Sequence, residues 1–176
     1  MTIKNSSISD IDAIFKQYLL ASKYQQSKKK VIVWPNFDRK MVENEIAEKR
    51  QFQLLIDGEI ACVWAITFSD PQIWEERNKD KAVYIHRIAT NPEYRGNNFV
   101  HTIVKWAKTL AANEDLQFIR LDTLGENKKL IAHYKNVGFD FLGLFHLKET
   151  SNLPEHYKKA AVCLFEINLH KKPFRI

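Results

Sequence analysis

Hydrophobic residues recur three or four residues apart, as on one face of a helix, in four stretches of the chain. In the first stretch Ser9 is a candidate N-cap, and the apolar stripe consists of Ile11, Ile14, Phe15, Tyr18 and Leu19. Asp38 is the candidate cap of a second helix that ends near Arg50. A third stripe runs from Phe99 to Ala111. Asn127 opens the fourth helix, and Gly138 ends it as a left-handed C-cap would.

Other stretches alternate between apolar and polar residues, which is typical of strands. After a short strand from Thr2, the predicted strands are 52–56, 60–68, 83–90, 117–123, 139–147 and 161–169. Asp57-Gly58-Glu59 joins the first two of these, and Asp-Gly is a strong signal for an antiparallel hairpin. Strands 83–90 and 117–123 flank the third helix, and such crossovers make the two strands parallel. The pattern predicts a mixed sheet with helices packed on it.

Two segments follow neither period. The first runs from Ser22 to Asp38 and the second, which is polar, from Ser69 to Lys81. We predict that the second segment is a loop, and its length suggests a binding or lid role. The chain has no internal repeat, low-complexity segment or clear linker. Its 176 residues therefore predict one domain, 1–176, with a sizeable core.

Composition narrows the class of protein. The apolar share of 45% argues against disorder, and no apolar run approaches the roughly 18 residues that span a bilayer. The first ten residues lack an apolar signal core, so we expect a cytoplasmic protein. Cys62 and Cys163 lie in apolar stretches without metal-ligand spacing, which favours buried reduced thiols. The net charge of +6 is compatible with nucleic acid, a membrane surface or a small polyanion as partner, and does not distinguish them. We interpret Lys28-Lys29-Lys30 as a solvated loop.

The stretch NPEYRGNNFV, residues 91–100, joins a predicted strand to a predicted helix. A helix N-terminus after such a turn is a common place for a phosphate, because backbone N–H groups point outward there. Turns of this kind usually contain several glycines, whereas this one has only Gly96, followed by Asn97 and Asn98. Asparagine is the best substitute for glycine at positive φ, so Asn98 does not exclude a phosphate site.

The order of these elements resembles the GNAT superfamily of acyl-CoA-dependent N-acyltransferases, along nearly the whole chain. PEYRG at 92–96 and NKKLIAHYKNVGF at 127–139 carry the resemblance most specifically. It implies an α/β (α+β) fold, with a mostly antiparallel seven-stranded mixed sheet, helices on both faces and a central parallel strand-helix-strand unit. The family turn has Arg or Gln, two variable residues, Gly, one variable residue, then Gly or Ala. Here Asn98 and Val100 stand in place of the two small residues. The 127–139 segment fits the family pattern better.

The resemblance implies acetyl-CoA as co-substrate and no metal. Pyrophosphate would bind to Arg95, Gly96, Asn97, Asn98, Phe99 and Val100. The amides of the pantetheine arm would pair with the backbone of Ile88, Ala89 and Thr90, and Asn127 would also hydrogen-bond the arm. The residues alone leave plainer interpretations open, namely a capped helix start with a surface arginine, a fully paired strand, and a helix cap at Asn127.

The reaction moves an acyl group from a thioester to an amine, so it needs a general acid for the thiolate and a base for the amine. By resemblance, Tyr134 is the general acid, although a tyrosine on this face of a helix also suits core packing. Family members often have a carboxylate on the strand that here contains His86 and Arg87. His86 is the candidate base because histidine titrates near neutrality, but a half-buried histidine bonded to backbone is an equal alternative.

Trp34, Phe37 and Trp74 are candidates for an apolar or cation-binding wall around the acceptor, and each is equally explained by packing. The sequence thus predicts an N-acetyltransferase acting on a primary amine of a small molecule or protein. A catalytically weak acyl-CoA-binding or sensing module is the first alternative. A basic nucleic-acid-binding domain is the second, which the strand pattern disfavours. We expect no nucleic-acid or membrane partner, and a homodimer is left open.

Overall fold

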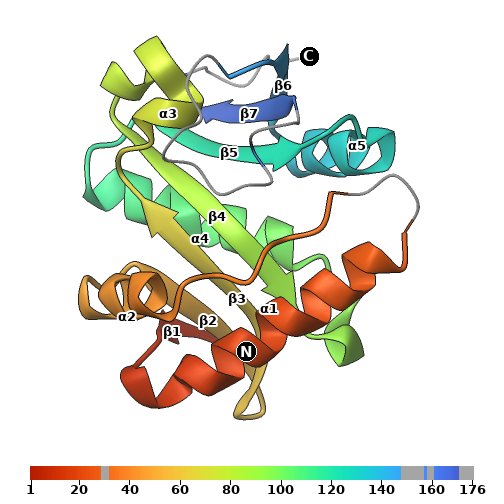
Figure 1. Cartoon of the computed structure of the whole chain (residues 1–176). Helices are drawn as coiled ribbons and strands as arrows, with labels where there is room; N and C mark the ends of the chain where they lie inside the picture. Colours follow the sequence, from red (N-terminus) through yellow and green to blue (C-terminus); the bar gives the residue numbers. More distant parts are fainter. Residues whose placement is uncertain (29–31, 148–156, 158–160, 171–176) are drawn as a thin grey trace. The chain divides into compact units, whose positions relative to one another are not determined.

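A computed structural model describes residues 1–28, 32–147, 157 and 161–170 of the chain (Figure 1). Within these residues, seven strands form one sheet in the order β1-β2-β3-β4-β5-β7-β6. The strands are β1 (Thr2–Asn5), β2 (Gln51–Ile56), β3 (Glu59–Thr67), β4 (Ala82–Thr90), β5 (Phe118–Leu124), β6 (Asp140–Phe145) and β7 (Val162–Asn168). The helices are α1 (Ile11–Gln26), α2 (Arg39–Ala47), α3 (Pro71–Trp74), α4 (Phe99–Asn113) and α5 (Lys128–Val137).

The predicted mixed sheet is confirmed. Strands β4 and β5 pair in parallel, with Ala82 opposite Phe118 and Tyr84 opposite Arg120. The pairs β1–β2, β2–β3, β5–β7 and β6–β7 are all antiparallel. The last strand along the chain, β7, lies between β5 and β6, which precede it in sequence.

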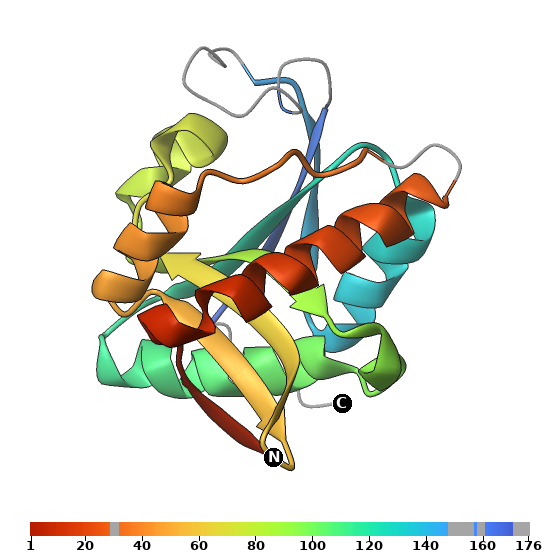
Figure 2. The same ribbon diagram turned by 60° about the horizontal axis from the view of Figure 1, so that its bottom comes forward.

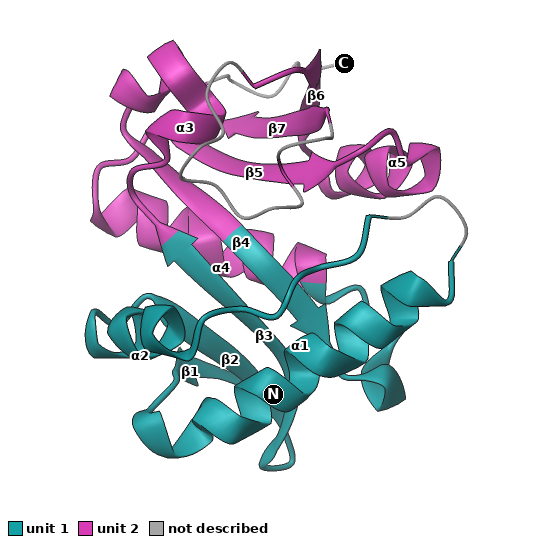
Figure 3. Cartoon of the chain, viewed as in Figure 1, with its two compact units in different colours: residues 1–66, 86–99, 154–156 teal, residues 67–85, 100–153, 157–176 magenta. Residues whose placement is uncertain are grey.

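The chain divides into two compact units (Figure 3). Unit 1 consists of residues 1–66, 86–99 and 154–156, and unit 2 of residues 67–85, 100–153 and 157–176. Strand β4 passes from unit 2 into unit 1 at His86. The expectation of a single domain, 1–176, therefore stays a prediction.

The core of unit 1 forms where α1 and α2 cover one face of its strands (Figure 2). The buried residues that meet there are Ile11, Ile14, Tyr18, Val42, Ile46, Val63 and Ala89. The side chain of Asp38 accepts a hydrogen bond of 2.9 Å from the N–H of Met41, which confirms it as the N-cap of α2. The N-terminal helix begins differently from the prediction. Ser7, rather than Ser9, forms a capping box with Asp10 ahead of a short 3-10 turn.

Local signals place the hairpin and α5 as predicted. Asp57 and Gly58 both have positive φ, 50° and 86°, which matches the twist of the flanking antiparallel strands β2 and β3. Asn127 caps α5 through a hydrogen bond from the N–H of Leu130, and Gly138 ends it at a φ of 107°. Cys62 and Cys163 are buried free thiols, as expected.

The prediction of a loop from Ser69 to Lys81 was wrong. The segment contains α3 and a 3-10 helix, Glu75–Lys79. Ile73 and Trp74 anchor it in the core of unit 2, where the Trp74 ring lies 5.5 Å from the ring of Tyr84. The polar composition of the segment led to the wrong prediction because Ile73 and Trp74 are its only fully buried residues. Arg120 of β5, 1% exposed, then holds the segment by donating to the backbone oxygen of Arg77 at 2.6 Å and to Asp80 at 2.5 Å.

Candidate active site

The turn that leads into α4 is fixed to the sheet of unit 1 at Asn91. Its backbone N–H donates to the oxygen of Ala61 at 2.9 Å, and its side-chain amide donates to the oxygen of Ile60 at 3.2 Å. The Asn91 side-chain oxygen also accepts from the N–H of Glu93, at the start of a single 3-10 turn, Pro92–Tyr94. This segment therefore begins at a defined position after β4.

Two residues of the turn have a left-handed backbone conformation. Gly96 has a φ of 91° and Asn98 a φ of 50°, and α4 begins at the next residue, Phe99. A Cβ on Gly96 would meet nothing within 4 Å, so glycine is needed there for its φ and not for space. The side chain of Asn97 donates to the oxygen of Tyr94 at 2.8 Å and closes the turn. An exposed turn of this kind ahead of a helix whose first N–H groups lack intrahelical partners can hold an anion.

Arg95 is exposed beside this turn. Its guanidinium carbon lies 4.0 Å from the centroid of the Tyr24 ring, at the C-terminal end of α1, and Lys28 Nζ lies 4.6 Å from the same centroid. Two cationic groups therefore stand over one aromatic ring next to the candidate phosphate site. The predicted contact of Arg95 with pyrophosphate stays a prediction.

The predicted pantetheine strand, Ile88 to Thr90, is the last part of β4. Ala89 is buried against α1 and α2, while Ile88 and Thr90 are partly buried. The hydroxyl of Thr90 lies 3.6 Å from the sulfur of Cys62. Just before this segment, Arg87 has a φ of 52° inside the strand, a left-handed conformation that L residues rarely adopt in a sheet.

Tyr134 lies on the inner face of α5. Its side chain is 8% exposed and packs edge-to-face on Phe139, and its ring centroid lies 5.0 Å from that of Phe165 on β7. The packing alternative is thus observed, and the general-acid role stays a prediction. The cap alternative for Asn127 is also observed, and its contact with pantetheine stays a prediction.

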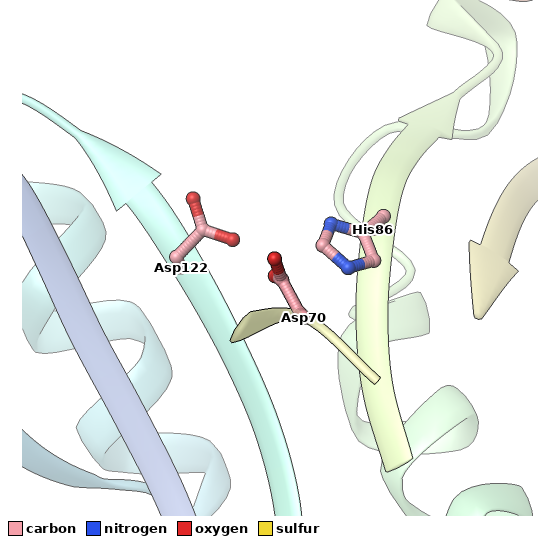
Figure 4. Close-up of side chains that lie close together, drawn as sticks. All are labelled: Asp70, His86 and Asp122. Carbon is pink, nitrogen blue, oxygen red and sulfur yellow. The ribbon is translucent and has the colours of Figure 1, made fainter. Parts of the chain in front are cut away.

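His86, the candidate base, is partly buried on β4 (Figure 4). Burial lowers its pKa to about 3, and the nearby positive charges of Arg87 and Arg50 act in the same direction. Its imidazole is therefore neutral at physiological pH. A conjugate acid this strong makes His86 a poor acceptor for the proton of an amine, because general bases work best with a pKa near the working pH.

Unit 2 contains a pair of carboxyl groups that the sequence did not single out, Asp70 ahead of α3 and Asp122 on β5 (Figure 4). A carboxylate oxygen of each lies within 4.8 Å of the other. Burial raises the pKa of Asp70 to about 7, with a further contribution from the charge of Asp122. Burial also raises the pKa of Asp122 to about 6, although Tyr157 donates a hydrogen bond of 3.0 Å to it. Groups that titrate near neutrality suit proton transfer.

The three aromatic residues predicted to line the acceptor site belong to two different units. Trp34 and Phe37 belong to unit 1, where their ring centroids lie 5.6 Å apart and both rings contact Tyr18. Trp74 is 2% exposed in the core of unit 2, with the Arg120 guanidinium 4.8 Å from its ring. The placement of Trp74 supports the packing alternative. The wall role of Trp34 and Phe37 stays a prediction.

Comparison with known proteins shows the family of the chain. The model of the Acetyltransferase (GNAT) family matches residues 13–139. An uncharacterized N-acetyltransferase of Bacillus subtilis (strain 168), YesJ, is 26% identical over 84 residues. That match covers 46% of this chain and 47% of YesJ, so it extends over about half of the relative's length.

Two solved structures show the same fold. A GNAT-family acetyltransferase of Listeria monocytogenes superposes with a TM-score of 0.76 at 22% identity, covering 96% of this chain and 94% of its own. The yncA protein of Salmonella typhimurium, solved with its cofactor acetyl-CoA, superposes with a TM-score of 0.67 at 10% identity, covering 100% and 98%. Among the described residues, moreover, no helix combines the length and apolar character that crossing a membrane requires.

Proposed function

Because this chain belongs to the GNAT family of acetyltransferases, we propose that it transfers an acetyl group from acetyl-CoA to a primary amine of a small molecule or a protein. The turn from Asn91 to Asn98 carries the proposal. It combines two left-handed residues, Gly96 and Asn98, with the start of α4 and with Arg95, which is the arrangement that a pyrophosphate needs. The predicted single domain, 1–176, would hold both substrates.

In the proposed reaction the amine nitrogen attacks the thioester carbonyl. A C–N bond forms, the C–S bond breaks, and the products are an amide and the thiol of CoA. The attacking amine loses a proton to a base, and the departing thiolate gains one from Tyr134. An unperturbed phenol has a pKa of about 10 and a thiol about 8.5, so this donation needs little tuning.

Two groups are candidates for the base. His86 is the one that the sequence indicates, but its lowered pKa limits its proton affinity. The Asp70–Asp122 pair retains a proton near neutral pH and so has the stronger affinity for one. Above about pH 6 at least one carboxylate of the pair is ionised and can accept the amine proton, and we therefore favour the pair over His86.

The second candidate function is a weakly catalytic acyl-CoA-binding or sensing module. The low pKa of His86 and the asparagine at position 98 are the observations that favour it. Such a module would bind acetyl-CoA through the same turn but would release CoA slowly, with or without an amine.

The test is acetyl-CoA turnover against a broad panel of amines, including polyamines, amino acids and peptides with free N-termini or lysines, followed by release of the CoA thiol. Amine-dependent release at a rate above hydrolysis supports the acetyltransferase. Binding of acetyl-CoA in calorimetry without release for any amine supports the sensing module. Absence of binding at millimolar acetyl-CoA would contradict both functions.

A further inference from the structure

Arg87 departs from regular strand geometry in the middle of β4. Its φ of 52° is left-handed, whereas His86 before it and Ile88 after it are not among the residues with positive φ. For an L residue this conformation is unfavourable, because Cβ comes too close to the following carbonyl oxygen. Arg87 must therefore be held in place by something outside its own backbone.

Its side chain makes the contacts that hold it. The guanidinium forms an ion pair with the carboxylate of Glu45 on α2, and Nε lies 3.4 Å from the hydroxyl of Tyr18 on α1. The guanidinium carbon of Arg87 also lies 5.4 Å from the centroid of the Phe37 ring. The side chains of Arg87 and Glu45 are only 14% and 9% exposed. Arg87 and its three partners all belong to unit 1. One side chain of β4 therefore contacts α1, α2 and the segment between these two helices.

Stability alone does not explain this arrangement. A buried ion pair is often no more stabilising than apolar residues of the same size, because both ions lose their hydration. Here the pair comes with a left-handed residue that adds a cost of its own. Conformations of this kind persist where the surroundings determine them strongly, and they gather at functional sites.

We propose that Arg87 is a positioning residue for the cofactor. Its anchored side chain fixes the left-handed backbone at position 87 and thereby sets the direction of the peptide groups of Ile88, Ala89 and Thr90. This inference rests on the proposed function, in which those peptide groups pair with the pantetheine arm of acetyl-CoA. The Arg87 side chain itself points to α1 and α2, so its role is to position the backbone.

Two double variants separate positioning from packing. Glu45→Gln with Arg87→Gly and Glu45→Gln with Arg87→Ala both remove the side-chain anchor. Replacing Glu45 avoids a buried carboxylate whose remaining ion pair is the 4.0 Å contact with Arg50. They differ by one Cβ at a left-handed position, where glycine is tolerated and alanine is not. We expect the alanine variant to bind acetyl-CoA about 5- to 10-fold more weakly than the glycine variant in calorimetry, since alanine relaxes to an extended conformation.

Three further measurements complete the test. Val42→Ala, in the same core but apart from the Arg87 contacts, should lower the melting temperature and leave acetyl-CoA affinity unchanged. If the double variants do not fold, Glu45→Gln alone should weaken affinity and speed amide exchange at 88–90. The inference would be overturned if the parent binds acetyl-CoA but the two double variants bind it with equal affinity. It would also be overturned if Glu45→Gln leaves both acetyl-CoA affinity and amide exchange unaltered. A parent that does not bind acetyl-CoA would overturn the proposed function as well.

Discussion

The hydroxyl of Tyr157 donates a hydrogen bond of 3.0 Å to Oδ2 of Asp122, a residue whose carboxylate lies within 4.8 Å of that of Asp70. The bond favours the charged form of Asp122, yet burial outweighs it and raises the pKa to about 6. The folded chain therefore binds protons at this pair that an unfolded chain, with carboxyl pKa values near 3.8, has already released.

This difference predicts how stability depends on pH. Because both folded pKa values are raised, the pair favours folding below about pH 4, and its contribution is lost as pH rises toward 7. Asp122→Asn keeps an acceptor for Tyr157 and removes one negative charge. It should raise the free energy of unfolding by about 1 kcal/mol or more at pH 8, with the gain shrinking below pH 4, as measured by urea unfolding.

Asp115→Asn is the matched control for that experiment. Asp115 is exposed and its carboxylate bonds to Lys81, which lowers its pKa. Its replacement should give no gain at pH 8. A gain in the control, or none in Asp122→Asn, would contradict the account of the carboxyl pair.

The pH–rate profile distinguishes the two candidate bases. With the pKa of His86 near 3, His86→Ala should leave an acidic limb between pH 6 and 7 in place, although it can lower the rate. Asp122→Asn should move that limb, because it changes the group that binds the proton. A limb that disappears only in His86→Ala would restore histidine as the base.

Tyr134→Phe tests the general acid. The ring packs on Phe139 and Phe165, and phenylalanine keeps those contacts, so the melting temperature and acetyl-CoA affinity should change little. Loss of a general acid should reduce turnover about 100- to 10,000-fold, measured by thiol release. Turnover at the parental rate would leave Tyr134 with a packing role alone.

The turn ahead of α4 predicts different stability costs for two glycine substitutions. Asn98 precedes the helix and already has a φ of 50°, so Asn98→Gly should cost little stability. Val100 lies in the first turn of α4, where Val100→Gly should cost about 1 kcal/mol. We expect the double variant to bind acetyl-CoA more tightly than the parent, by calorimetry. Weaker or equal affinity would show that Asn98 and Val100 suit this ligand.

Local signals in the sequence were sufficient for most of the fold. The cap at Asn127, the glycine that ends α5 and the Asp-Gly hairpin each depend on a few adjacent residues, and each was predicted. The positive φ of Asn98 follows from the same kind of reasoning. Where the period was weak, as in 69–81, the prediction failed because two buried side chains, Ile73 and Trp74, outweighed a polar composition.

The candidate site was less accessible to sequence reasoning because its chemistry depends on distant partners. Asp70 and Asp122 acquire raised pKa values only when β5 and the segment before α3 meet, and neither residue stands in a motif. The low pKa of His86 arises from its burial and from the charges of Arg87 and Arg50, and Arg50 lies far from it in the chain. The left-handed φ of Arg87 likewise depends on Glu45 and Tyr18, and no strand propensity anticipates it.

The position of β7 has a consequence for biosynthesis. Strands β5 and β6 leave the ribosome before β7, yet β7 pairs with both of them. Until residues 162–168 emerge, the nascent chain carries two unsatisfied strand edges, which are templates for aggregation. A frameshift or proteolytic cut ahead of Val162 would therefore expose both edges at once, and we expect such truncated chains to depend on chaperones or to be degraded.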